Sequence, residues 1–562
     1  MDKFWLSSYP DAAPAEIPVA AYPTLVDMFE ASCKRFSEQT AFTHLDVAVS
    51  YAGLERQSRR FAACLQGRLG LAKGDRIAIM LPNLLQYPVA LFGALRAGLV
   101  VVNVNPLYTA RELAEQLDDS GACAVVVLEN FAHTLEQALQ TVHVPHVVTT
   151  EVGDLFPPLK RWAVNFVVKR VKRLVPRWRI AGAISFRDML SAGAALELRQ
   201  ISLSPDDLAF LQYTGGTTGT PKGAMLSHRN MIANVEQTMA WVGNTLVAGR
   251  ETVLTALPLY HVFALTANLL LFVRLGGNDV LVSDARDLPA LIETMKKSRV
   301  SAMTGVNTLF SALLNAQGFD EVCRANRGAL KLSVAGGMAV QQAVAERWQK
   351  ALGVPLVEGY GLTEASPNVC ANRFDTKTFS GKLGLPLPST DVAIMDEHGE
   401  QLPLGEVGEI WVRGPQVMRG YWNRPEETAA VLTPDGWLKT GDMGWMNPQG
   451  YVGFTERRKD VIVVSGFKAY PTEIEEVAKL HPSVRDAGAI GVPDERSGEA
   501  VALFVVKAEA GLTAEAVREH CAKYLTGYKL PRRIEFRDRL PKTPLGKVLR
   551  RELRDEMLGA HG

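Results

Sequence analysis

Residues 76–360 alternate between short apolar runs and longer segments with helical spacing of apolar residues, and this alternation is the strongest constraint on the fold. It is typical of parallel sheets covered by helices on both faces. The expected strands cover residues 76–81, 99–104, 124–128, 208–213, 280–282 and 330–334. At 562 residues the chain exceeds the ~250–300 residues at which one core stops growing, so at least two domains are expected.

Two further units follow along the chain. Residues 381–453 contain short strands punctuated by Gly and Pro, clearest at 392–395 and 409–412, and predict a compact, mostly antiparallel β unit. From about residue 461, helical patterns at 473–480 and 513–524 and a strand at 501–506 predict a third unit. The five consecutive charges of residues 456–460 indicate an exposed linker, although a solvated turn has the same composition.

Composition excludes several classes of protein. With 61 basic and 60 acidic side chains, the net charge of +1 gives no overall attraction to nucleic acid, so no nucleic-acid partner is expected. The six scattered cysteines and the lack of a histidine cluster argue against structural zinc and a disulfide framework. The N-terminus lacks the run of ~7–15 apolar residues of a signal peptide, and residues 262–273 fall short of the ~20 that span a bilayer. We expect a cytoplasmic protein.

The segment 213–226 follows an apolar run and contains five hydroxyls, four glycines and one lysine. Glycines let backbone N–H groups approach an anion, threonines add donors, and Lys222 adds positive charge, so the segment predicts a phosphate-binding loop. A flexible surface loop is the structural alternative. Because Gly223 follows Lys222, the segment does not match G-x-x-x-x-G-K-[ST], and a Walker-type NTPase is not supported.

This loop resembles the phosphate loop of the adenylate-forming superfamily, which includes acyl-CoA synthetases, luciferases and adenylation domains of peptide synthetases. Further segments match that superfamily in the expected order, at residues 357–364, 436–442, 456–460 with 465–468, and 541–547. Residues 435–445 resemble the fatty acyl-CoA synthetase signature. Similarity to the bacterial long-chain enzymes extends to residues 84–91, 106–113, 525–529 and 549–554. The chain as a whole therefore resembles the bacterial long-chain fatty acid–CoA ligases.

The resemblance implies the α/β adenylate-forming fold. A large N-terminal AMP-binding domain, residues 1–456, would contain two βα-layered subdomains and a small β-barrel-like subdomain at about 381–456. Residues 457–460 would form a hinge linker, and residues 461–562 a small, mobile α+β domain.

The resemblance also implies a two-step reaction with ATP, Mg²⁺ and coenzyme A. The carboxylate of a long-chain fatty acid attacks the α-phosphorus, pyrophosphate leaves, and the acyl-AMP is attacked by the coenzyme A thiol, which releases AMP. Alternatives are a medium-chain or aryl acid, acyl transfer to a carrier protein, or a catalytically silent binder of acyl-AMP or nucleotide. The presence of Lys547, Glu364 and Asp442 together disfavours the silent binder.

The implied catalytic residues are Lys547, Thr214, Glu364 and His261. Lys547 would reach the substrate carboxylate and the α-phosphate, and Glu364 would bind Mg²⁺ together with Thr217. Phosphate contacts are expected from Thr214, Gly215, Gly216, Thr217, Thr218, Gly219, Thr220 and Lys222. A structural role remains an alternative for His261.

The adenine site would be lined by Gly336, Gly337, Glu358, Gly359, Tyr360, Gly361 and Thr363, with the Tyr360 ring against the base. Asp442 would accept hydrogen bonds from the ribose hydroxyls and Arg457 would contact ribose or phosphate, although turns and exposed arginines of this kind also occur without function. Lys459 is the implied hinge residue, and Ser465, Gly466 and Phe467 the implied thioester-forming face. An apolar acyl tunnel is expected near residues 259–271 and 304–314.

Residues 160–179 hold eight Lys or Arg and no acid. The apolar positions 164, 167, 168, 171, 174 and 175 share one face of an expected helix that ends before Pro176. Such a helix can lie on an anionic leaflet, here the inner face of the cytoplasmic membrane, or pack on its own protein with its basic face in water. The sequence leaves both alternatives open, and likewise a monomer or a homodimer.

Overall fold

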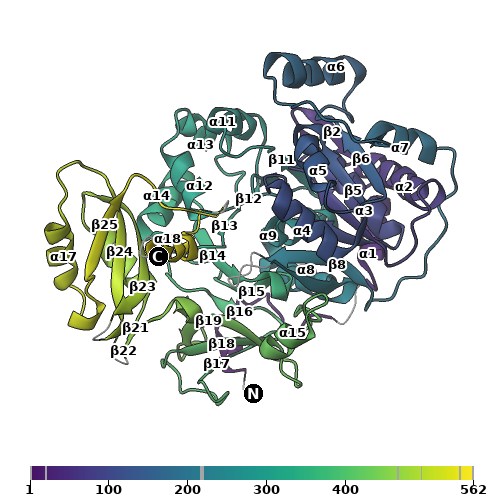
Figure 1. The fold of residues 1–562 in the computed structure, drawn as a ribbon. Helices are drawn as coiled ribbons and strands as arrows, with labels where there is room; N and C mark the ends of the chain where they lie inside the picture. The colour runs from purple at the N-terminus through teal and green to yellow at the C-terminus, as the bar shows by residue number, and fades with distance from the viewer. Residues whose placement is uncertain are drawn as a thin grey trace.

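The computed structural model describes residues 3–18, 22–214, 221–464, 467–494, 497–543 and 546–559. Two large sheets, one four-stranded sheet and one five-stranded sheet account for the strands of these residues. Figure 1 shows the two large sheets side by side, the four-stranded sheet below them, and the C-terminal sheet on the flank.

The seven-stranded sheet contains the first four predicted strands and has the order β7-β6-β5-β3-β4-β8-β9. Its strands are β3 (Arg76–Met80), β4 (Val100–Asn103), β5 (Ala122–Leu128), β6 (His146–Thr150), β7 (Ile184–Ser185), β8 (Leu208–Thr214) and β9 (Lys222–Ser227). All neighbours are parallel except β8 and β9. Ile77 and Ile79 enter one core while Ala78 and Met80 enter another, so both faces are covered, as predicted.

The helices that cover this sheet are α2 (Tyr51–Gly67), α3 (Gln86–Arg96), α4 (Ala110–Ser120), α5 (Ala132–Ala138), α7 (Phe186–Gly193) and α8 (His228–Val242). Every residue of α3 is buried, because this helix lies between the sheet and its neighbours. Thr109 and Ser227 begin α4 and α8 with reciprocal side-chain caps.

The nine-stranded sheet has the order β16-β15-β14-β13-β12-β10-β11-β1-β2 and is parallel from β14 to β1. Its strands are β1 (Thr40–His44), β2 (Val47–Ser50), β10 (Thr252–Thr255), β11 (Asn278–Leu281), β12 (Ala302–Gly305), β13 (Leu332–Ala335), β14 (Leu356–Gly361), β15 (Asn368–Ala371) and β16 (Leu385–Pro386). The predicted strands near 280 and 332 are confirmed. The N-terminal strands β1 and β2 join this second sheet, although they precede the first sheet in the chain.

The four-stranded sheet confirms the predicted antiparallel unit. It runs β17 (Asp391–Met395), β18 (Gly408–Arg413), β19 (Leu438–Met446) and β20 (Val452–Arg457) in chain order. Figure 1 shows β17, β18 and β19 of this sheet below the nine-stranded sheet.

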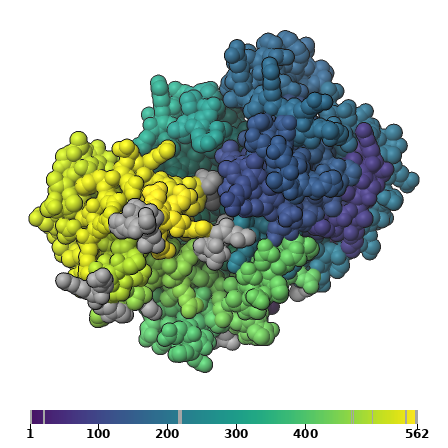
Figure 2. Space-filling view, in the orientation of Figure 1, coloured from purple at the N-terminus to yellow at the C-terminus, as the bar shows by residue number. Residues whose placement is uncertain are grey.

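The C-terminal unit, the part of the chain from residue 461, has its own sheet and its own apolar clusters. The sheet is formed by β21 (Ile462–Val464), β22 (Phe467–Ala469), β23 (Val484–Asp494), β24 (Gly498–Lys507) and β25 (Arg533–Arg537). Three helices accompany it, α16 (Pro471–Lys479), α17 (Ala514–Ala522) and α18 (Arg550–Gly559). The predicted helices and the strand of this unit are confirmed. Figure 2 shows it, in yellow, seated against the green and teal parts of the chain.

Helix α6 (Pro158–Phe166) projects from the seven-stranded sheet (Figure 1) and continues as the π-helical turn η3 (Val167–Val171). We call residues 158–179 the arm. The predicted helix through residue 175 is wrong at its C-terminal end, because the chain turns at Arg173 with φ 51°. In the described part of the chain, no helix has both the length and the apolar character needed to cross a bilayer.

Candidate active site

Asp442 and Tyr360 bring the four-stranded and nine-stranded sheets together. The Tyr360 hydroxyl donates to Asp442 Oδ2 at 2.7 Å, and Arg457 Nε lies 2.9 Å from Asp442 Oδ1. Arg457 stands opposite Asp442 in the ladder of β19 and β20, and Asp442 is only 2% exposed. Asp442 raises the pKa of Arg457, and burial followed by Asp442 raises the pKa of Tyr360. The carboxylate still has lone pairs for further O–H donors.

Glu364 lies in the turn η6 (Thr363–Ala365), which contacts β8 and β9. Its Oε1 accepts a hydrogen bond from the Tyr421 hydroxyl at 2.7 Å, and Lys222 Nζ lies 5.4 Å from the centre of the Tyr421 ring. Tyr421 is held beside β9 by a bridge to Ala224. Tyr421 was not among the predicted site residues, although it joins two of them, Glu364 and Lys222.

Thr214 and Lys222 are paired across β8 and β9, so the phosphate-loop candidate begins and ends at one point of the sheet. The residues between them that were predicted to bind phosphate, Gly215, Gly216, Thr217, Thr218, Gly219 and Thr220, lie outside the described residues. The contacts of η6 with both strands place Glu364 next to the base of this loop.

Glycines allow close backbone approach in the predicted adenine region. A Cβ on Gly361 would lie 2.1 Å from the Pro367 carbonyl oxygen, and one on Gly336 would lie 3.2 Å from that of Gly359. Glu358 lies on β14, and its Oε1 accepts a hydrogen bond from the Val340 N–H at 3.3 Å. Burial raises the pKa of Glu358 to about 7, and its buried Oε2 has no hydrogen-bond partner.

His261 caps α9 (Val262–Ala264), and its Nδ1 accepts from the Phe263 N–H at 3.3 Å. Burial lowers the pKa of His261 to about 4, so the ring is neutral at neutral pH with its proton on Nε2. A Cβ on Gly336 would lie 3.0 Å from the Phe263 ring, which places this cap beside the adenine candidates. The structure thus gives His261 a structural contact and also brings it to the site.

The expected tunnel segments are packed as core. Every residue from 262 to 273 is buried, across α9, η5 (Leu265–Leu270) and α10 (Leu271–Leu275). Asn268 donates to Thr255 Oγ1 at 2.7 Å and accepts from the Thr304 hydroxyl at 2.8 Å. The acyl tunnel therefore remains a prediction.

Lys547 lies in a hairpin-like loop that the C-terminal unit extends toward the site. The Thr543 N–H donates to the Lys547 carbonyl at 2.8 Å, and the Lys547 N–H donates to Thr543 Oγ1 at 3.1 Å. Gly546, with φ 82°, lies so close to α12 (Asn307–Leu314) that its Cβ would be 3.1 Å from Thr308 Oγ1. Burial, and after it the charge of Arg457, lowers the pKa of Lys547 to about 8, while Asp442 opposes this shift. Lys547 is thus within electrostatic reach of the Asp442 cluster, the group formed by Asp442, Tyr360 and Arg457.

The residues predicted for the hinge and the thioester face lie elsewhere. Lys459 is exposed in the short turn η7 (Arg458–Asp460). Phe467 is 60% exposed and stacks on Tyr528 at a centroid distance of 5.1 Å within the C-terminal unit. Ser465 and Gly466 lie outside the described residues.

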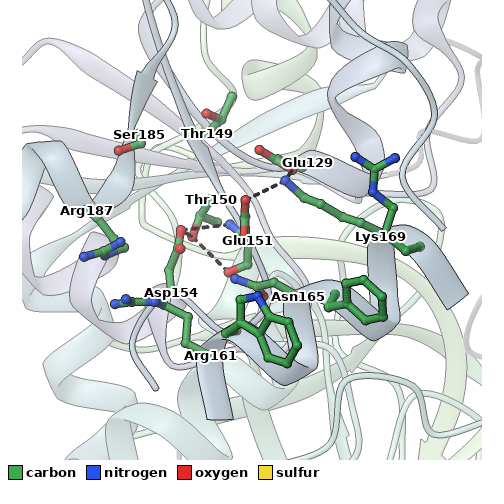
Figure 3. A pocket seen from close by; sticks show the side chains of 13 residues that line it. Glu129, Thr149, Thr150, Glu151, Asp154, Arg161, Asn165, Lys169, Ser185 and Arg187 are labelled. Atoms are coloured by element: carbon green, nitrogen blue, oxygen red, sulfur yellow. Dashed lines mark hydrogen bonds and ion pairs between the residues drawn. The ribbon is translucent and has the colours of Figure 1, made fainter. Parts of the chain in front are cut away.

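A cavity of about 410 Å³ lies beneath the arm and contains none of the predicted site residues. The Lys169 side chain extends along this cavity (Figure 3), and its Nζ forms ion pairs with Glu129 Oε2 at 2.6 Å and with Glu151 Oε1 at 2.5 Å. Arg161, Arg170 and Arg187 also line it. The cavity therefore shows how the arm is anchored, and the predicted site residues Asp442 and Glu364 lie outside its lining.

Comparison with known proteins matches two family models to the chain. The AMP-binding enzyme model covers residues 29–422, and the AMP-binding enzyme C-terminal domain model covers residues 473–547. A long-chain-fatty-acid–CoA ligase of Yersinia pestis is 54% identical over 99% of this chain and 98% of its own length. The enzyme of the same name from Bacillus subtilis is 38% identical over 100% of this chain and 99% of its own length.

Solved structures agree with the fold. ATP-bound MatB from Rhodopseudomonas palustris superposes with a TM-score of 0.79 at 27% identity, over 96% of this chain and 100% of its own. An o-succinylbenzoate–CoA synthetase of Bacillus subtilis, in complex with its acyl-adenylate intermediate, gives a TM-score of 0.76 at 27% identity, over 95% and 98%.

Proposed function

The chain belongs to the AMP-binding enzyme family and, within it, to the bacterial long-chain-fatty-acid–CoA ligases, and from this membership we propose that it activates a long-chain fatty acid. ATP converts the acid to an acyl-AMP with release of pyrophosphate, and coenzyme A then takes the acyl group and releases AMP. The observation that carries the proposal is that Lys547, from the C-terminal unit, lies near enough to the Asp442–Arg457 pair of the four-stranded sheet for both charges to act on its pKa.

Lys547 acts in the adenylation step. A mobile ammonium in a water-poor site stabilises the negative charge that moves from the carboxylate to the α-phosphate and pyrophosphate. The close pairing of Gly546 with Thr308 delivers the loop to this position. Arg457, already paired with Asp442, adds a second positive charge for phosphate or ribose.

Asp442 and Tyr360 form the nucleoside end of the site. The Tyr360 hydroxyl is committed to Asp442, so the ring is fixed in orientation and its face is available to the adenine base. Asp442 has two oxygens held in place by Tyr360 and Arg457 and accepts the ribose hydroxyls. Gly336, Gly337, Gly359, Gly361 and Thr363 supply close backbone around the base, and Glu358, a carboxyl with a free oxygen, supplies hydrogen bonding.

Glu364 is the residue that fits Mg²⁺. Within the described ranges, no group of three or more His, Cys, Asp or Glu side chains could hold a metal ion alone. One carboxylate next to a phosphate loop suits a cation that takes most of its ligands from phosphate oxygens and water. We assign Glu364 and Thr217 as protein ligands, and the bound ion neutralises phosphate charge.

The domain boundaries follow from the same proposal. Residues 1–456 form the adenylation domain, 457–460 the hinge and 461–562 the mobile domain, which has apolar clusters of its own. Rotation about Lys459 removes Lys547 from the site and brings Ser465, Gly466 and Phe467 to it for thioester formation. The exposed position of Phe467 is compatible with this assignment, because its ring is accessible for contact after such a rotation.

The arm is the proposed contact with the inner face of the cytoplasmic membrane. Six large apolar residues of the arm are exposed, namely Leu159, Trp162, Phe166, Val167, Val171 and Leu174. Trp162 is 68% exposed and stacks on Phe166, and the cationic side chains beside them complement anionic headgroups. Lys169 is committed to Glu129 and Glu151, so it anchors the arm and does not face lipid.

Vesicle sedimentation tests the arm. Trp162→Ala with Phe166→Ala should reduce sedimentation with phosphatidylglycerol vesicles, whereas Leu480→Ala, an exposed leucine of the C-terminal unit, should not. Equal sedimentation of both variants contradicts the membrane proposal.

A homodimer is the second proposal on association, and sedimentation velocity in the absence of lipid tests it.

Pyrophosphate release tests the function itself. Wild type and Lys547→Ala are assayed with ATP, Mg²⁺ and fatty acids from C6 to C18, with and without coenzyme A. Release that peaks with long chains and yields acyl-CoA supports the proposal. A peak at medium chains, activity with aryl acids, or transfer to a carrier protein in place of coenzyme A supports the alternatives, and no release with any acid contradicts it.

A further inference from the structure

A buried ionic network surrounds Arg550, the first residue of α18. Arg550 is 8% exposed and is three residues beyond Lys547. Its guanidinium donates to Glu475 through Nε at 3.0 Å and Nη2 at 2.9 Å, and through Nη1 to Glu456 Oε1 at 2.9 Å and Asp460 Oδ2 at 3.3 Å. Burial lowers the pKa of Arg550, but the charges of Glu475 and Glu456 raise this pKa by more than burial lowers it. The guanidinium therefore stays charged.

Glu456 differs from the other acids of this network because it precedes the hinge at Lys459. It is the penultimate residue of β20, before Arg457, and is 1% exposed. Its Oε1 accepts from Arg550 Nη1, and its Oε2 accepts from the Thr472 N–H at 2.6 Å. Both oxygens of one carboxylate on the N-terminal side of the hinge are therefore held by groups on the C-terminal side.

These two hydrogen bonds oppose rotation about the hinge. When the unit turns, the buried Glu456 carboxylate keeps the hydrogen bond that its Oε1 accepts from the Arg457 N–H at 2.8 Å, but it loses its only cation and the donor to Oε2. A buried charge that loses its cation is among the more costly changes in a protein interior. Asp460 and Glu475 lie after Lys459, so their bonds to Arg550 move with the C-terminal unit. Only the Glu456 contacts of this network must break when the unit turns.

We propose that Glu456 is a latch that, through Arg550 and Thr472, holds the C-terminal unit in the orientation that presents Lys547 for adenylation. The inference rests on the proposed two-step function and adds a positioning residue to it. Because Arg550 and Lys547 are separated by less than one helical turn of sequence, the latch also fixes the end of the loop that carries the lysine. Release of the latch then accompanies the change to thioester formation.

The test separates the two half-reactions in Glu456→Gln, which keeps the size of the side chain and removes its charge. Adenylation is measured as hexadecanoate-dependent exchange between ATP and pyrophosphate. Thioester formation is measured with preformed hexadecanoyl-AMP and coenzyme A. We expect the ratio of adenylation to thioester rate to fall about tenfold, because the variant weakens one orientation only.

Hinge exposure gives a readout that is independent of activity. The hinge contains Arg457, Arg458 and Lys459, and trypsin should cleave there faster in Glu456→Gln than in wild type. Glu475→Gln is the matched control, because it removes a carboxylate that binds Arg550 without crossing the hinge; it should change both half-reactions by a common factor. Glu456→Asp, which keeps the charge, should recover part of the wild-type ratio.

Equal losses in both half-reactions of Glu456→Gln, or a wild-type ratio with wild-type hinge cleavage, would overturn the latch. If Glu456→Gln does not fold, Glu456→Asp decides the question by the same ratio and cleavage rate. Failure of the proposed function has a different signature: the wild-type protein would activate no fatty acid, while hinge cleavage would still report whether Glu456 restrains the linker.

Discussion

The Asp442 cluster and the Lys547 loop meet at one site but are held in very different ways. Asp442 lies in the middle of β19, Tyr360 near the end of β14, and Glu364 in a turn packed on β8 and β9. The register of β19 and β20 sets Arg457 opposite Asp442, and Tyr360 donates to the same carboxylate. Lys547 is held by two hydrogen bonds within its own loop and by the contact of Gly546 with Thr308. The binding groups are thus built into the scaffold, while the group that must leave between two steps is held by contacts within its own loop, by Thr308 and by the proposed latch.

The largest expected effect comes from removing the mobile group. Lys547→Ala should lower adenylation by ~10²–10³-fold, the range seen when one charge-stabilising donor is lost, and leave thioester formation from preformed acyl-AMP near wild type. Lys542→Ala is the control, because Lys542 precedes Lys547 in the same loop and its ion pair with Asp486 is partly exposed to solvent. A similar loss in both half-reactions would show that Lys547 is part of the scaffold.

A glycine-to-alanine substitution in each of the two regions tests whether the scaffold and the Lys547 loop differ in this way. Gly361→Ala puts a Cβ 2.1 Å from the Pro367 oxygen, so it should lower the melting temperature and both half-reactions. Gly546→Ala meets Thr308 at 3.1 Å with φ 82°, so it should reduce adenylation about tenfold with little change in melting temperature. Thermal unfolding with both assays checks this. A large loss of stability in Gly546→Ala would show that the loop is built into the scaffold.

Within the scaffold, Tyr360→Phe tests how far Asp442 depends on its neighbour. Loss of one hydrogen bond of about 1 kcal/mol should raise the KM for ATP about fivefold, with a smaller change in kcat. Tyr524→Phe, at an exposed tyrosine of the C-terminal unit, should leave both constants unchanged. An unchanged KM in Tyr360→Phe would mean that Arg457 alone orients Asp442.

The smallest expected effect is a pH dependence. Because the pKa of Lys547 is lowered to about 8, the free enzyme loses its ammonium as the pH rises, so kcat/KM for adenylation should be halved near pH 8 and fall further above it. Thioester formation should not follow this curve. Adenylation that stays constant to pH 10 would indicate a lysine with an ordinary pKa and, by inference, a loop that does not dock closely.

The strands around residues 76–128 and 208–213 were predictable because a strand buried on both faces must be apolar along its whole length. The arm was predicted less well. Periodicity indicated a helix to residue 175, but it ends at Val171, and Val164 of the expected apolar face packs on the core while Trp162 is exposed. Periodicity shows that a face is apolar and does not show which surface covers it.

The family, the reaction chemistry and the candidate residues could be predicted from the order of amino acids alone, because glycine-rich loops and charged motifs have their chemistry wherever they are placed. Tertiary structure decided which of these residues meet. It joined Glu364 to Lys222 through Tyr421, placed β1 in the second sheet, and set Glu456 against Arg550, 94 residues later in the chain. Such contacts depend on the packing of whole sheets, which no local pattern of residues encodes.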